Sequence, residues 1–193
     1  MKERIGLFGG TFNPIHNGHM EIAKIAMERL HLNKVIFIPS FIPHFKSLPI
    51  VSFSHRYKMV SLAIFGHPDF SVSDIESKRK GKSYTIDIVR YFKRKTKADI
   101  YFIAGSDSLI GIPKWKDYKD LLKECQFVVF NRPKFILGDF PYESIGNIIF
   151  SRIKEIDISS TMIRDRIRDG LEIKELVPAM VELHIDCEQL YRD

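Results

Sequence analysis

The stretch GGTFNPIHNGH, residues 9–19, decides how this chain begins to fold. The apolar run at 5–8 before it predicts a short buried strand, and the amphipathic run at 18–30 after it predicts a helix. The glycine pair therefore stands at a turn between a strand and a helix. Amides at a helix N-terminus carry partial positive charge, and glycine lets an anion approach the backbone closely. The stretch accordingly predicts a phosphate-binding site.

Two histidines, His16 and His19, lie three residues apart in this stretch, so in the first turn of a helix both rings would project from one face. Three interpretations compete: two phosphate donors, half of a zinc site, or capping and packing. Catalytic zinc usually has three protein ligands, and only Glu21 lies nearby, so the sequence predicts no resident metal. The glycine turn beside the histidines favours phosphate donors over purely structural roles.

Length and composition predict one domain over residues 1–193, with a small helical C-terminal part from about 158, because 193 residues at 45% hydrophobic content can close one core. No apolar run is long enough for a membrane span, and the N-terminal residues lack the apolar core of a signal peptide. We therefore expect a cytoplasmic protein that binds no membrane.

The two cysteines, Cys125 and Cys187, are expected to be buried thiols and not a disulfide.

The basic balance of the chain, 30 Lys and Arg against 24 Asp and Glu, suits polyanionic ligands. Two clusters, 78–82 and 93–97, raise the alternative of an RNA-binding protein. The second cluster ends a predicted helix, where cations suit the helix dipole. Neither cluster has the interleaved aromatic residues of an RNA-binding sheet, so we expect no nucleic-acid partner.

Strand-like and helix-like segments alternate along the chain, which predicts a doubly wound parallel α/β sheet. The further strands are expected at 35–39, 70–74, 100–105, 127–130 and 148–150, and the further helices at 54–65 with Ser54 as its cap, 83–95 and 116–123. Ligands in such sheets bind beyond the carboxyl ends of the strands, where 9–19, 39–46 and 105–115 should converge. Neither the dinucleotide fingerprint nor a P-loop occurs.

Two motifs in the expected order carry a family resemblance. GGTFNPIHNGH closely resembles the signature of the HxGH-type nucleotidyltransferases, whose fold is Rossmann-like, and ISSTMIR at 158–164 resembles the ISSTxIR motif that accompanies it. Further stretches resemble a narrower family, the bacterial nicotinate-nucleotide adenylyltransferases: SYT at 83–85, GSDSL at 105–109, Trp115 with Tyr118, and LVP at 176–178 followed by a helix that reaches LY at 190–191. The resemblance covers essentially the whole chain.

The resemblance implies a reaction in NAD biosynthesis that joins ATP and nicotinate mononucleotide to give deamido-NAD and pyrophosphate, with Mg²⁺ carried by ATP. It implies His16, His19 and Arg164 as catalytic residues. The ATP-binding residues that it implies are Gly9, Gly10, Thr11, Phe12, His16, Gly18, His19, Gly105, Asp107, Ile158, Ser159, Ser160, Thr161 and Arg164. Those implied for the mononucleotide are Asn13, His44, Lys46, Ser83, Tyr84, Thr85, Trp115 and Tyr118. A homo-oligomer is compatible with the sequence.

Two positions depart from the family pattern. Position 13 is Asn where the family often has Asp, and the extra Phe45 leaves the phosphate contact open between His44 and Lys46. A transferase for phosphopantetheine or a cytidylyl acceptor is the nearest alternative, which the chain length disfavours. A class I aminoacyl-tRNA synthetase is disfavoured because the chain is short and has no KMSKS-like motif.

Several roles stay open from the residues alone. Trp115 suits stacking on a pyridine ring but equally suits core or surface packing. Asp107 could bind a ribose hydroxyl, organise the phosphate site or cap a helix, and either Ser159 or Ser160 could cap the helix that follows them. Amides at the start of the helix near 83–85 would favour the nicotinate carboxylate over a neutral amide.

Overall fold

The computed structural model describes residues 2–42, 51–79, 83–105, 111–130, 148–151 and 157–192. These residues form a six-stranded sheet in the order β3-β2-β1-β4-β5-β6, and each neighbouring pair of strands is parallel. The strands are β1 (Arg4–Gly10), β2 (Lys34–Pro39), β3 (Phe70–Val72), β4 (Asp99–Gly105), β5 (Gln126–Phe130) and β6 (Ile148–Ser151). The predicted doubly wound parallel sheet is confirmed.

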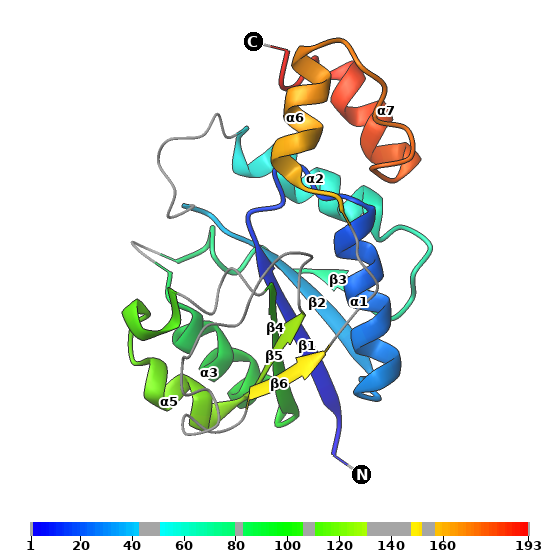
Figure 1. Ribbon diagram of the computed structural model, residues 1–193. Helices are drawn as coiled ribbons and strands as arrows, with labels where there is room; N and C mark the ends of the chain where they lie inside the picture. The colour runs from blue at the N-terminus through cyan, green and yellow to red at the C-terminus, as the bar shows by residue number, and fades with distance from the viewer. Residues whose placement is uncertain are drawn as a thin grey trace.

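Helices cover both faces of this sheet (Figure 1). The described helices are α1 (Asn17–Arg29), α2 (Phe53–Ala63), α3 (Thr85–Thr96), α5 (Tyr118–Glu124), α6 (Ser160–Arg168) and α7 (Ala179–Cys187), with a short 3-10 turn, η1 (Ile112–Lys114). Side chains of α1, α2, α6 and α7 share one core cluster, whereas those of α3 and α5 share the other. Figure 1 shows α6 and α7 beyond the carboxyl end of β1, which is the end where ligands bind in such folds.

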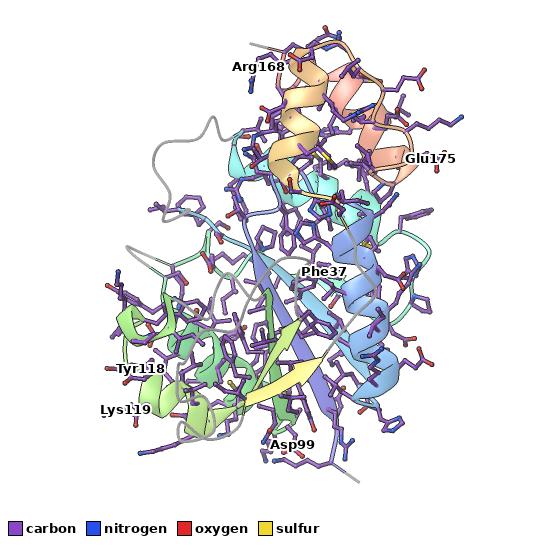
Figure 2. The ribbon with its side chains drawn as sticks, in the orientation of Figure 1. Phe37, Asp99, Tyr118, Lys119, Arg168 and Glu175 are labelled. Carbon is purple, nitrogen blue, oxygen red and sulfur yellow. The ribbon has the colours of Figure 1, made fainter. Side chains whose placement is uncertain are left out.

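Alternation along the central strand assigns its side chains to the two cores. Leu7 is buried in the cluster of α3 and α5, and the next residue, Phe8, is buried in the cluster of α1 and α2. Phe37 of β2 lies beside Phe8 with a ring centroid distance of 5.4 Å, and Figure 2 shows it in the middle of the molecule. Because both faces are covered, the strands read as continuous apolar runs.

Element boundaries agree with the predicted ones within about two residues, except that α7 ends at Cys187 and does not reach 190–191. The predicted cap Ser54 is wrong: Ser52 caps α2, because its Oγ accepts a hydrogen bond from the amide of His55. Helix α5 begins two residues later than predicted because Asp117 has a left-handed φ of 50°. Strand β3 ends at Val72, where its pairing with β2 ends. The cluster at 93–97 does end a helix, α3.

The two cysteines differ in their surroundings. Cys125 is buried as predicted, and burial raises the pKa of its thiol to about 12. Cys187 is exposed at the end of α7, so the prediction of a buried thiol is wrong there. The apolar pattern around it faces the core through Val181 and Ile185, which leaves position 187 on the other side of the helix. Within the described residues no helix is long and apolar enough to cross a membrane.

Candidate active site

The glycine pair lies inside β1 and not in a turn as the sequence predicts. Gly9 pairs with Ile38 and Gly10 with Pro39, so the strand runs to the end of the pair. A Cβ at Gly10 would stand 2.9 Å from the ring of Phe12, and one at Gly9 would stand 2.9 Å from the ring of Phe102. Aromatic packing at the end of the strand therefore requires these glycines, whether or not a ligand is bound.

Phe12 makes the turn after β1. Its φ is 51°, and its side chain is only 2% exposed. The ring packs edge-on against Phe8, at a centroid distance of 5.6 Å, and against His19, at 5.0 Å. Since the ring is buried, the backbone of Phe12 is the part that a nucleotide could contact.

The two histidines meet at the start of α1. His16 is the N-cap residue, and its backbone amide donates to Nδ1 of His19 at 3.3 Å. The ring centroids lie 3.7 Å apart, and both side chains are buried. Because Nδ1 of His19 accepts a hydrogen bond, the proton of the neutral ring stands on Nε2. Nε2 is then the atom of His19 that can donate to a phosphate oxygen.

The second motif lies directly against the first. Ser159 caps α6 by accepting from the amide of Met162 at 3.1 Å, so of the two predicted candidates Ser159 is the cap. The hydroxyl of Ser160 donates to the carbonyl of Pro14 at 2.8 Å. Two stretches some 140 residues apart in the chain thus come together, as the resemblance implies. Ile158 packs against the core beside them.

Arg164 is buried, at 4% exposure, and its guanidinium has protein partners. Nη1 donates to the carbonyl of Asn13 at 2.8 Å, and Nη2 donates to Oγ1 of Thr161 at 3.1 Å. The resemblance implies a phosphate contact for this guanidinium and for Thr161. That contact stays a prediction, and what the geometry adds is that Arg164 holds α6 against the first motif.

The segment after α6 also reaches back to the first motif, which sequence reasoning missed. The hydroxyl of Tyr191 donates to Oδ1 of Asn13 at 2.9 Å, and the amide of Val51 donates to the same oxygen at 3.3 Å. The backbone amide of Asn17 donates to the carbonyl of Leu176, and its Nδ2 donates to the carbonyl of Glu175. Figure 2 shows Glu175 in the loop between α6 and α7. The sequence signals were the family-like stretches at 176–178 and 190–191.

Arg56 is a second residue that the sequence analysis missed. It is 1% exposed, and its guanidinium donates to the carbonyls of Thr11 at 2.9 Å, Ser40 at 2.7 Å and Val51 at 3.2 Å. Burial lowers the pKa of this guanidinium from its ordinary value. The sequence holds a signal for it: Arg56 shares the buried stripe of α2 with Met59, Val60 and Ala63, at helical spacing.

The residues implied for the pyridine end gather on the other face of the sheet. Helix α3 begins at Thr85, and its N-cap Tyr84 has the ammonium of Lys116 over its ring, 4.6 Å from the centroid. Trp115 is half-buried and packs edge-on against Phe102 and Phe127. Tyr84, Trp115 and Tyr118 pack on the same core cluster, and Figure 2 shows Tyr118 on α5.

The structure describes some of the remaining predicted site residues, and others lie outside the described ranges. Gly18 is buried in the first turn of α1, and Gly105 ends β4 opposite Phe130. Ser83 precedes α3, and its hydroxyl oxygen is buried with no hydrogen-bond partner among the described residues. His44, Lys46 and Asp107 lie outside the described residues. Within the described ranges no group of three or more His, Cys, Asp and Glu side chains could hold a metal ion.

Comparisons with known proteins agree with this arrangement. A family model described as cytidylyltransferase-like matches residues 7–166. A probable nicotinate-nucleotide adenylyltransferase of Clostridium tetani is 41% identical over 201 residues, covering 100% of both chains, and one of Clostridium acetobutylicum is 43% identical over 200 residues, covering 99% of this chain and 100% of its own. This chain belongs to the nicotinate-nucleotide adenylyltransferase family. The resemblance found in the sequence is confirmed.

Solved structures confirm the fold of this adenylyltransferase family member. The nicotinic acid mononucleotide adenylyltransferase of Plasmodium falciparum complexed with NaAD has a TM-score of 0.80 at 22% identity, covering 98% of this chain and 97% of that one. A structure described as a nicotinate-nucleotide adenylyltransferase of Vibrio parahaemolyticus has a TM-score of 0.71 at 21% identity, with 99% and 96% covered. At these identities the likeness is one of fold.

Proposed function

We propose that this family member joins ATP to nicotinate mononucleotide, giving deamido-NAD and pyrophosphate. The observation that carries the proposal is the junction of the two motifs: His16 and His19 at the start of α1, with the start of α6 bound to the same turn through Ser160. Two helix N-termini and two imidazoles beside one turn suit a polyphosphate. The nicotinate-nucleotide adenylyltransferase names of the relatives support the choice of substrates.

In the proposed mechanism the phosphate of the mononucleotide attacks the α-phosphorus of ATP in line, and pyrophosphate leaves. No covalent protein intermediate is needed, so catalysis consists of positioning and charge stabilisation. Nε2 of His19 donates to a phosphate oxygen while Nδ1 stays fixed by the amide of His16. The Mg²⁺ that accompanies ATP supplies positive charge to the phosphates. The amides at the starts of α1 and α6 add the dipole of each helix.

For the pyridine ring, we place the nicotinate carboxylate at the start of α3 and the ring against Trp115. The edge contacts of Trp115 with Phe102 and Phe127 would fix its plane before the substrate arrives. A carboxylate gains more than a neutral amide from the helix dipole, so the acid should be preferred to nicotinamide mononucleotide.

The test is pyrophosphate release from the purified protein with ATP, Mg²⁺ and either nicotinate or nicotinamide mononucleotide. We expect turnover with the acid and much less with the amide. His19→Ala should lower kcat about a hundredfold or more, because a donor to the transition state is lost. His67→Ala, in the turn before β3, is the matched control and should leave kcat unchanged.

A thermal melt of each variant separates this loss from unfolding, because His19 also packs on Phe12. Wild-type kcat in folded His19→Ala would refute the catalytic role. Absence of pyrophosphate with both mononucleotides would refute the proposed acceptor and favour another phosphorylated acceptor, such as phosphopantetheine.

A further inference from the structure

We propose that Tyr191 is a positioning residue for the turn after β1 (residues 11–13), where the proposed function places the phosphates. Its hydroxyl orients Asn13 and through it contributes to the rate of adenylyl transfer, without touching substrate. The inference rests on the proposed function. It concerns a residue that follows α7, more than 170 residues from the turn in sequence, and that bonds to it directly, at 2.9 Å.

The geometry fixes which way the side-chain amide of Asn13 faces. A phenol hydroxyl and a backbone amide, from Tyr191 and Val51, both donate to Oδ1, so this end of the side chain acts as an acceptor. The Nδ2 end consequently faces away from Tyr191. Because Asn13 is only 4% exposed, water offers little replacement for either donor.

The main chain of the same residue is held independently. Arg164 donates to the carbonyl of Asn13, and Ser160 donates to the carbonyl of Pro14. With the backbone anchored by α6, the two donors to Oδ1, the hydroxyl of Tyr191 and the amide of Val51, set the rotation of the Asn13 side chain. The two functions, anchoring and orienting, therefore belong to different residues and can be separated by substitution.

Tyr191 itself is built to keep this contact. Its φ of 65° lies in the left-handed region, which costs a tyrosine about 1 kcal/mol or more and persists where the surroundings hold it. The ring packs against the core cluster of α1 and α2. Burial raises the pKa of the phenol above its ordinary value, so the hydroxyl stays protonated and donates at every pH where the enzyme would work.

The test compares Tyr191→Phe, which removes one oxygen and keeps the ring, with the matched control Tyr101→Phe. Tyr101 lies in β4, packs on the same core cluster and is near the amino end of the strand, away from the turn. We expect Tyr191→Phe to lower kcat about tenfold at 25 °C with each KM within about threefold, since a displacement of about 1 Å in a positioned group can cost up to a hundredfold. Tyr101→Phe should behave as wild type.

A double-mutant cycle tests whether the effect passes through Asn13. In an Asn13→Ala background the change Tyr191→Phe should have no further effect on kcat, because its acceptor is gone. A tenfold loss in that background would overturn the proposal. Wild-type kcat in Tyr191→Phe, with a lower melting temperature alone, would also overturn it by showing a purely structural bond.

A spectroscopic readout does not depend on which mononucleotide the protein uses as substrate. The side-chain NH₂ signals of Asn13 in a ¹⁵N spectrum, assigned by their loss in Asn13→Ala, should shift in Tyr191→Phe and stay in place in Tyr101→Phe. Unchanged signals in Tyr191→Phe would overturn the positioning role. Absence of pyrophosphate from the wild-type protein with nicotinate mononucleotide would instead refute the proposed function, and these signals would still decide the role of Tyr191.

Discussion

His16 and His19 combine roles that the sequence analysis treats as alternatives. His19 Nδ1 accepts the amide of His16, and the ring of His19 packs on Phe12. These are capping and packing contacts, and the phosphate proposal adds a donor role for Nε2 of the same ring. The structural contacts set the tautomer that the proposed chemistry needs. Sequence spacing predicts the shared face, whereas the tautomer depends on atomic contacts.

Arg56 provides a prediction at the scale of a single residue. Arg56→Lys should lower the free energy of unfolding by about 3 kcal/mol, because the single nitrogen of an ammonium cannot take the places of both Nε, which donates to Val51, and Nη1, which donates to Thr11 and Ser40. Urea unfolding at pH 7.5 measures the change.

The control for that experiment is Arg94→Lys, at an exposed position in the last turn of α3, where we expect a change within about 0.5 kcal/mol. Equal unfolding midpoints for Arg56→Lys and wild type would show that the carbonyl contacts of Arg56 contribute nothing to stability.

At the scale of elements, α6 depends on its cap. Ser159→Ala removes the oxygen that accepts from Met162 and should lower the free energy of unfolding by about 1 kcal/mol in urea. Ser61→Ala in the last turn of α2 is the matched change: its hydroxyl donates to the carbonyl of Tyr57, one turn back, and alanine is the better helix former, so no loss is expected. A loss of the same size in both variants would contradict the capping role of Ser159.

Helix starts also show where element prediction from sequence fails. Ser52 and Ser54 are both good cap residues two positions apart, and the apolar pattern at 54–65 does not distinguish them. The structure selects Ser52 because its backbone is not helical, with φ −52° and ψ 156°, and its Oγ reaches the amide of His55. The choice rests on local dihedral angles that side-chain periodicity does not encode.

At the scale of the whole molecule, the contact between α2 and α7 predicts a dependence of stability on pH. Nδ1 of His55 and Nε2 of His184 lie 3.3 Å apart, one from each helix. Burial, and then the nearby charge of His55, lowers the pKa of His184 below its ordinary value near 6.5, with Lys58 acting in the same direction and Glu188 against it. The folded chain thus prefers the neutral ring of His184 more than the unfolded chain does.

The sign of the effect follows from proton uptake. Below pH 6.5 the unfolded chain binds the proton of His184 more readily, so stability present above that pH is lost as pH falls. The melting temperature should therefore decrease from pH 7.5 to pH 5.5, and His184→Gln should reduce this decrease. His67→Gln, away from the helix contact, should keep the full decrease; identical decreases in all three proteins would exclude His184 as a cause.

The sequence by itself determined the sheet, the order of its elements, both nucleotidyltransferase motifs and the family, because strand and helix periodicity and short turn motifs are local properties. It also indicated that 9–19 and 158–164 act together, through the resemblance. The single-domain organisation and the individual ligand contacts stay predictions.

Only the tertiary structure decided which side chains hold residues 11–13, the turn after β1. Arg56, Arg164 and Tyr191 come from α2, α6 and the segment after α7, and all three bond to atoms of residues 11–13. Their contacts join residues between 45 and 178 positions apart in the chain. No local pattern specifies such pairs, since they arise when packing of the α1 and α2 face brings the C-terminal helices onto the carboxyl end of β1.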